Sequence, residues 1–353
     1  MRSSQGAPRR RGLSLSSREA LWAYAFMLIP LGFFLFFRLW PAIQSLKLSL
    51  FTWHVDPEQR VFIGLQYYRE MYANIAAKGD LYKALRNMLY YFLIVVFGQV
   101  SLGMISAILL NSITRLKGLF RAIYFAPYVT PAAAVAWVWG WMYSVNFGIF
   151  NKFLGDWSEF VTGIGLPWLS IDPQPFLTSP KQALIAVAAV VVWQQLGFQV
   201  VIFLAGLQGI PRPMLEAADI DGANGWQRFW GVTFPLLNPV IVFSLIISTI
   251  STLQMFDQVQ NINFTDQGGP LGSTLTIALY MYQQAFQKFR IGYAAAVTVL
   301  LFAIILVITL IQLKVTQRKV EYGGPHSAST PRAAVARASR PAAASPTCCG
   351  RSA

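Results

Sequence analysis

The sequence predicts an all-α integral membrane protein with six transmembrane helices. Of its 353 residues, 55% are hydrophobic and only 12% are charged, whereas an average soluble domain is about 25% charged. The mean hydropathy is +0.49, and the apolar residues gather in six long stretches without charge. So much apolar surface suits a bilayer and argues against both a soluble enzyme and a disordered chain.

Each predicted span corresponds to one charge-free window. A bilayer core needs about 20 apolar residues, and a charge at its centre costs about 2.5–3.5 kcal/mol on insertion scales. The windows cover residues 20–37, 87–114, 122–151, 182–211, 229–256 and 291–313. Within them we expect helices over 20–40, 89–111, 122–145, 183–206, 234–256 and 291–313.

The first window follows three arginines at 9–11, as the apolar region of a secretory signal peptide would. It is longer than such a region, contains Pro30 and is followed by no small-residue cleavage site. We therefore expect an uncleaved first span, with Arg38 at its end and its charge directed outward beside Trp40.

Basic residues predict that both termini face the cytoplasm. With the N-terminus inside, the inner segments hold 17 Lys and Arg residues and the outer segments hold 10. Cytoplasmic segments of membrane proteins carry the larger share. This bias explains the formal net charge of +14 without a nucleic-acid partner, because the sequence has no basic stripe interleaved with aromatic residues.

Three regions follow along the chain: a basic cytoplasmic N-terminus (1–19), a membrane domain (20–320) with a cytoplasmic loop at about 210–235, and a basic cytoplasmic tail (321–353). The tail is rich in Ala, Ser, Pro, Gly and Arg and holds both cysteines, Cys348 and Cys349. Because it has almost no large apolar residue, we expect it to be disordered.

The sequence shows no pattern typical of catalytic or metal chemistry. It has no G-x-x-x-x-G-K-[ST] phosphate loop, no H-E-x-x-H motif and no Cys/His cluster at metal-ligand spacing. All six windows are free of charged residues, which argues against an ion-driven carrier. The polar residues inside them either join helices by hydrogen bonds or line a path for a hydroxyl-rich solute. They are Gln99, Gln194, Gln195, Gln199, Ser248, Ser251, Thr252 and Gln254.

The loop over 210–235 is the most informative segment. Pro211 and Pro213 end the fourth span and can begin a short helix. Glu216 and Asp219 share a face of that helix, near the positive end that favours acids, and the two alanines between them let another surface approach closely.

A turn is predicted next, at Asp221-Gly222. A second short amphipathic helix with Trp226, Phe229 and Trp230 then leads into the fifth span. On physical grounds alone, the loop is either a hairpin lying on the membrane or a docking element.

The whole pattern resembles the E-A-A-x3-G-x9-I-x-L-P signature of permease subunits in binding-protein-dependent ABC importers. Here it reads Glu216-Ala217-Ala218, three residues, Gly222, nine residues and Val232-Thr233-Phe234-Pro235. Val232 and Phe234 replace the usual Ile and Leu, which are apolar exchanges. The resemblance covers about residues 22–318.

Other segments resemble the carbohydrate branch of this family, the maltose-type and glycerol-phosphate-type permeases. The matching segments are Gly64-Leu65-Gln66-Tyr67-Tyr68 (G-L-x-N-Y, with Tyr67 in place of Asn), Ala84-Leu85-Arg86-Asn87 (A-x-x-N-T), and Gly268-Gly269-Pro270 followed by Leu275-Thr276-Ile277-Ala278-Leu279-Tyr280 (G-G-P…T-x-x-L-x-x-Y).

This resemblance implies the type I (MetI-like) importer permease fold and a place in the bacterial inner membrane. It implies a second permease subunit in a heterodimer, an extracytoplasmic binding protein that delivers a sugar, and two cytoplasmic ATPase subunits. ATP and Mg would be used by those ATPase subunits, so this chain would be no enzyme and would hold no cofactor. The ATPase-coupling residues implied are Glu216, Ala217, Ala218, Asp219, Gly222 and Pro235.

A solute path is implied as well. In maltose-type permeases the tyrosine of a P-Y-x-x-P segment faces the sugar, and Tyr128 occupies that position here. Leu196 and Gly197 match the Leu-Gly of the fourth span. The fifth-span positions are Ser248, Thr252 and Met255, where the maltose type has Ser, Asn and Asn. The loss of both asparagines argues against maltose being bound through this subunit.

Two other classes stay open on the residues alone. A stand-alone channel or secondary carrier for a neutral polar solute would work without an ATPase, and the 210–235 loop argues against it. A membrane-embedded glycosyltransferase would use acids at a membrane face. Asp156, Glu159 and Asp172 are available for it, although solvated loop acids are more common.

Overall fold

The computed structural model describes residues 15–54, 56–113, 115–263 and 266–317, and the predicted tail over 321–353 lies outside these ranges. Within them the regular elements are helical, and Phe51 and Phe62 form an isolated antiparallel bridge. The predicted all-α fold class is confirmed.

Five helical stretches are long and apolar enough to cross a bilayer. They are Trp22–Leu48, Asp80–Ser112, Ala183–Gln208, Gly225–Leu253 and Ile291–Val315. Two shorter helices, Lys117–Val129 and Ala132–Met142, meet at 95° and pass the same test together. With this bent pair counted as one broken span, the six predicted spans are present.

Short π-helical turns divide several of the long helices. The α-helices are α1 (Leu15–Phe34), α2 (Trp40–Leu48), α3 (Gln66–Ala76), α4 (Asp80–Tyr91), α5 (Phe97–Ser112), α6 (Lys117–Val129), α7 (Ala132–Met142), α8 (Ile149–Gly163), α9 (Ala183–Gln208), α10 (Arg212–Ile220), α11 (Gly225–Arg228), α12 (Phe234–Leu253), α13 (Asp257–Ile262), α14 (Ile277–Tyr282) and α15 (Ile291–Gln317).

The first span does not end near residue 40 as expected but continues through α2. Pro41 would normally break a helix, because its ring clashes with the carbonyl four residues earlier. That carbonyl lies in the π-helical turn Leu35–Leu39, where the wider helix gives room. Arg38 therefore lies inside the helix and not at its end. The same spacing recurs at Pro235, two residues after the turn Phe229–Thr233.

The third span, expected as one helix over 122–145, is broken between α6 and α7. Thr130 is extended (φ −70°, ψ 135°), since a residue before proline is pushed out of the α region. Pro131 also has no N–H to continue the helix. The prediction of a continuous helix is wrong here, and the proline after Thr130 is the reason.

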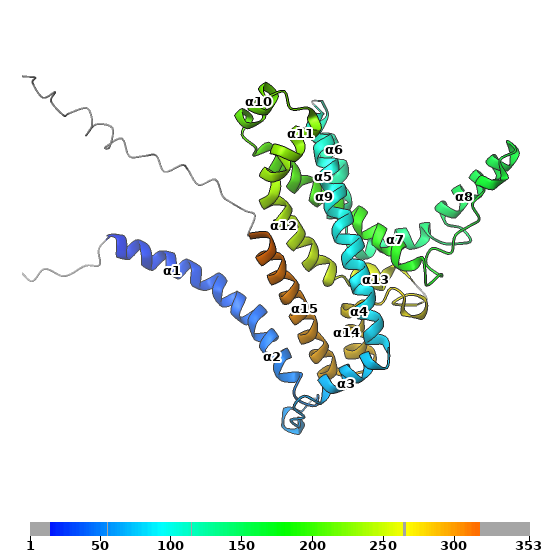
Figure 1. The fold of residues 1–353 in the computed structure, drawn as a ribbon. Helices are drawn as coiled ribbons and strands as arrows, with labels where there is room; N and C mark the ends of the chain where they lie inside the picture. Colours follow the sequence, from blue (N-terminus) through cyan, green and yellow to red (C-terminus); the bar gives the residue numbers. More distant parts are fainter. Residues whose placement is uncertain (1–14, 55, 114, 264–265, 318–353) are drawn as a thin grey trace, which may run out of the picture.

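The bundle is built around α5 and α9, which pack along each other with α12 beside them (Figure 1). Gly103 of α5 lies against the side chain of Gln199 on α9, so that no larger residue would fit. Small residues permit this close approach of helices in membranes.

At the end of the bundle that carries α3, an ion pair joins α3 to the start of α15. Arg290 donates to both carboxylate oxygens of Glu70 at 2.7 and 2.6 Å, and its guanidinium lies 4.5 Å from the ring centre of Tyr293. The hydrogen bond with Glu70 raises the pKa of Arg290 above its ordinary value. The pair fixes the entry of the last span.

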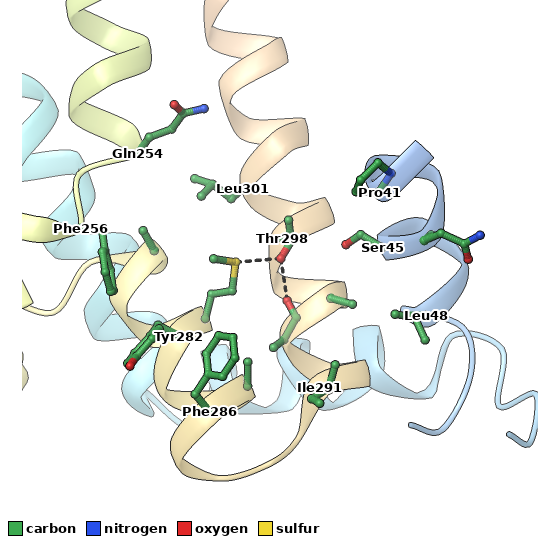
Figure 2. Close-up of a pocket in the computed structure, with 16 residues that line it drawn as sticks. Pro41, Ser45, Leu48, Gln254, Phe256, Tyr282, Phe286, Ile291, Thr298 and Leu301 are labelled. Carbon is green, nitrogen blue, oxygen red and sulfur yellow. Dashed lines mark hydrogen bonds between the residues drawn. The ribbon is translucent and has the colours of Figure 1, made fainter. Parts of the chain in front are cut away.

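The first span leans away from the bundle, and only its α2 end approaches α15 (Figure 1). A mainly apolar groove of about 660 Å³ lies between α2, α14 and α15. Figure 2 shows Pro41 and Leu48 on one side of it and Tyr282 and Leu301 on the other.

Candidate functional site

The loop predicted over 210–235 folds as a helical hairpin at the end of the molecule opposite α3 (Figure 1). Pro211 caps α10 in an extended conformation (φ −60°, ψ 126°), and Pro213 lies in its first turn, as expected. Gly222 has φ +74°, a conformation that glycine adopts without strain. The predicted helix start and turn are confirmed.

One face of α10 is left open. Pro213, Glu216, Ala217 and Ile220 are exposed and follow helical spacing, whereas Ala218 is turned inward and buried. Ile220 is 86% exposed and was not predicted from the sequence to belong to the site. Glu216 forms no hydrogen bond or ion pair with the described part of the chain. The face thus presents a free carboxylate beside an apolar side chain.

Asp219 was expected near the positive end of this helix, which is wrong. Because α10 begins at Arg212, Asp219 lies in its last turn, where the helix dipole disfavours an acid. Arg228 compensates, since its Nη1 donates to both carboxylate oxygens at 2.7 and 3.0 Å. This ion pair connects α10 to α11.

The second helix of the hairpin is the beginning of the fifth span. Asn224 and Gln227 form a capping box, with Gln227 N–H donating to Asn224 Oδ1 at 2.8 Å and Asn224 N–H donating to Gln227 Oε1 at 2.9 Å. The helix then runs through the π-helical turn and Pro235 into α12. The hairpin is therefore joined to α12 without a flexible connection.

Tyr128, Leu196 and Gly197 lie together where α6 crosses α9. The ring of Tyr128 stacks on Phe198, with centroids 5.1 Å apart, and is 37% exposed. Gly197 touches the backbone of Tyr124, so its lack of a side chain brings the two helices together. Leu196 is half-buried in the same contact region.

Ser248, Thr252 and Met255 are buried on and just after α12. Ser248 accepts a hydrogen bond from Gln199 Nε2 at 2.6 Å, and Gln199 Oε1 accepts one from Ser244 at 2.5 Å. Thr252 Oγ1 has no hydrogen-bond partner in the described part of the chain. The structure thus groups the six residues predicted for the solute path in two places, the α6–α9 crossing and the inner side and end of α12.

Two positioning roles were not foreseen from the sequence. Gln194 Nε2 donates to the carbonyl of Thr130 at 3.1 Å, and its Oε1 accepts from Gln258 Nε2 at 3.0 Å. Gln194 thereby satisfies a carbonyl that the helix break leaves free. Asn87 Nδ2 donates to the carbonyls of Gly272 and Leu275 at 2.8 and 3.1 Å, which brings together two of the segments that carry the carbohydrate-branch resemblance.

Among the described residues no group of three His, Cys, Asp or Glu side chains could hold a metal ion. The candidate site combines neutral polar residues in the bundle with one exposed hairpin.

Comparisons with known proteins agree with this arrangement. The family model described as "Binding-protein-dependent transport system inner membrane component" matches residues 99–321. The chain is 30% identical over 287 residues to the sn-glycerol-3-phosphate transport system permease protein UgpA of Agrobacterium fabrum, covering 81% of this chain and 92% of that one. It is 34% identical over 288 residues to the lactose transport system permease protein LacF of Rhizobium radiobacter, with 78% and 87% covered.

A solved structure of a bacterial alginate ABC transporter, in complex with an alginate pentasaccharide-bound periplasmic protein, contains a similar chain. The TM-score is 0.70 at 21% identity, covering 85% of this chain and 96% of the other. The predicted importer permease fold and the resemblance to the carbohydrate branch are confirmed by these findings.

Proposed function

Because the chain belongs to the family of binding-protein-dependent transport system inner membrane components, we propose that it forms half of the translocation pathway of an ATP-driven sugar importer. A second permease subunit completes the pathway in the bacterial inner membrane. An extracytoplasmic binding protein delivers the sugar, and two ATPase subunits, which use ATP and Mg, supply the energy from the cytoplasm.

The observation that carries this proposal is the open face of α10. A free carboxylate at Glu216 and an apolar side chain at Ile220 lie beside Ala217, so that a partner could approach closely and pair with the acid. A hairpin resting alone in water would gain nothing from exposing Ile220. We infer that this face docks on an ATPase subunit.

Motion at the docked hairpin would reach the solute path through rigid elements. The Asp219–Arg228 ion pair and the capping box join α10 to α11, and α11 continues into α12. Ser248 and Thr252 lie on α12. Closure of the ATPase pair would therefore move the α12 polar residues together with the hairpin, as packed segments do in domain closure.

The test is purification of this chain from cells that also produce the second permease and the ATPase. We expect the ATPase to co-purify and its hydrolysis rate to rise when binding protein loaded with a suitable sugar is added. Screening a sugar panel would identify the solute. Ile220→Asp should release the ATPase, whereas Leu271→Asp, an equally exposed apolar position (80%) outside the hairpin, should retain it.

A stand-alone carrier would give a different result. It would move a neutral solute in vesicles that contain no ATPase, and Ile220→Asp would leave that transport unchanged. Such an outcome would overturn the importer assignment.

A further inference from the structure

The helix α8, between the third and fourth spans, has an apolar face that the described chain leaves largely exposed. Ile149, Phe153, Trp157, Phe160 and Ile164 recur at intervals of three or four residues, and each is between 40% and 67% exposed. With 3.6 residues per turn, they fall within an arc of about 80°. Lys152, Asp156 and Glu159 lie to one side of this arc.

The other side of α8 is already occupied by the loop that follows it. Ser158 Oγ bonds both the N–H and the carbonyl of Ile171 at 2.8 Å. Trp157, at the edge of the open face, donates its Nε1–H to the Leu169 carbonyl at 3.2 Å. Val161 is 1% exposed. The segment is thus packed on one side by its own residues, and the aromatic and aliphatic face remains open on the other.

The position of α8 brings this face close to a bilayer surface. It lies between α7, part of the broken third span, and α9, a complete span. Since α9 leads to the hairpin at its far end, α8 belongs to the opposite membrane face. Only six residues separate the end of α7 from Ile149, so α8 begins within about 25 Å of the end of α7. Figure 1 shows α8 beyond α7 and away from the bundle.

We propose that α8 is an interfacial helix that lies along the bilayer surface opposite the hairpin, with the Ile149–Ile164 side of the helix inserted among the phospholipids. Two exposed aromatic residues precede this face in the chain, Trp141 (65%) in the last turn of α7 and Phe147 (75%) in the loop that leads to α8. Tryptophan and phenylalanine on the apolar side, with charges at the flank, are the composition that such helices use.

Nitroxide accessibility tests this placement in the assembled complex in phospholipid nanodiscs. Cys348→Ser and Cys349→Ser, with partner subunits that carry no reactive cysteine, provide a background for single labels. Phe153→Cys and Phe160→Cys report on the apolar face, and Lys152→Cys and Glu159→Cys are the matched controls on the same helix. Oxygen concentrates in the bilayer and a nickel chelate in water, so each label's collision rates with both are compared.

We expect the oxygen-to-nickel ratio to exceed one at 153 and 160 and to fall below one at 152 and 159. A ratio below one at 153 and 160 would place the face in water and overturn the proposal. Low collision with both reagents would show that another subunit covers it, which would also overturn the proposal. Ile149→Cys supplies a third position if either labelled complex is not monodisperse, and the readout does not depend on transport.

Discussion

At the scale of single residues, Thr252 and Gln194 are both buried, but their polar groups differ in hydrogen bonding. Thr252 is 3% exposed, and its buried hydroxyl has no partner in the described chain. A buried hydroxyl without a hydrogen bond costs free energy, and one explanation is that a solute supplies the partner. In Gln194, by contrast, both the amide nitrogen and the amide oxygen form hydrogen bonds, and the nitrogen donates to the backbone carbonyl of Thr130.

Thr252→Val tests the solute explanation, because it removes the hydroxyl and keeps the shape. Stability should not fall and should rise by up to about 1–3 kcal/mol, because the substitution removes a buried hydroxyl without a partner. If the hydroxyl bonds the sugar, the sugar concentration for half-maximal ATPase stimulation should rise about 2- to 10-fold, the equivalent of one neutral hydrogen bond. Unchanged sugar dependence with normal assembly would assign Thr252 to helix packing.

Gln194→Leu should destabilise the complex by about 1–3 kcal/mol, because it leaves the Thr130 carbonyl and the Gln258 amide without a partner. Thermal unfolding of the purified complex measures this loss. Gln195→Leu is the matched control, since the neighbouring side chain makes no such bond in the described chain. Equal unfolding temperatures for both variants would contradict the role of Gln194 at the helix break.

At the scale of elements, the exposed Asp219–Arg228 ion pair of the hairpin contributes little to stability but helps to hold α10 and α11 in a fixed arrangement. The Asp219 and Arg228 side chains are 53% and 41% exposed, so their pair adds less than about 1 kcal/mol to folding. It nevertheless fixes the angle between α10 and α11, together with the capping box and the turn at Gly222. Its effect should therefore be on coupling and not on stability.

A charge swap separates these two effects. Asp219→Arg and Arg228→Asp should each place like charges side by side and reduce the sugar stimulation of the ATPase, while the complex unfolds at nearly the normal temperature. The double variant should recover much of the stimulation, because the pair is restored in reverse. A double variant no better than either single one would mean that Asp219 acts through a partner subunit and not through Arg228.

Glu216→Ala and Gly222→Leu test the open face itself. Truncating one partner of a buried charge pair costs about 2–5 kcal/mol, and leucine at φ +74° is strained. Both variants should insert normally but lose uptake and release the ATPase, as measured by co-purification. Glu159→Ala, an exposed acid on α8, is the control for charge alone. Normal uptake and ATPase retention in both variants would remove the basis of the coupling proposal.

At the scale of the whole molecule, hydropathy predicted the spans because lipid allows few alternatives to a charge-free helix of sufficient length. It could not predict what prolines do inside them. Pro41 is accommodated by a π-helical turn, whereas Pro131 breaks its helix. The Thr130 carbonyl at the break accepts a hydrogen bond from Gln194, 64 residues farther along the chain. No local sequence pattern predicts that pairing.

The candidate site, too, could be predicted from the sequence only in part. The hairpin was predicted because its helix start, its turn and its small residues are neighbours in the sequence. The partners of Ser248 and Asp219 depend on how α9 packs on α12 and α10 on α11. Helix register decides such contacts, so Asp219 was placed at the wrong end of α10.

Orientation in the membrane is the last property that the whole chain decides. Arg115 lies between the second and third spans, Lys117 and Arg121 lie in the first turns of α6, and Arg212 and Arg228 lie in the hairpin. The third and fourth spans separate the start of α6 from the hairpin, so both are on one membrane face. This clustering predicts that the face is cytoplasmic.

In the Cys348→Ser, Cys349→Ser background, Ala223→Cys in the hairpin should react with a membrane-impermeant maleimide only after the inner membrane is opened. Asp172→Cys, in the loop after α8, should react without that step once the reagent has access to the periplasm. The reverse pattern would invert the topology and place the α10 face where no ATPase subunit could reach it.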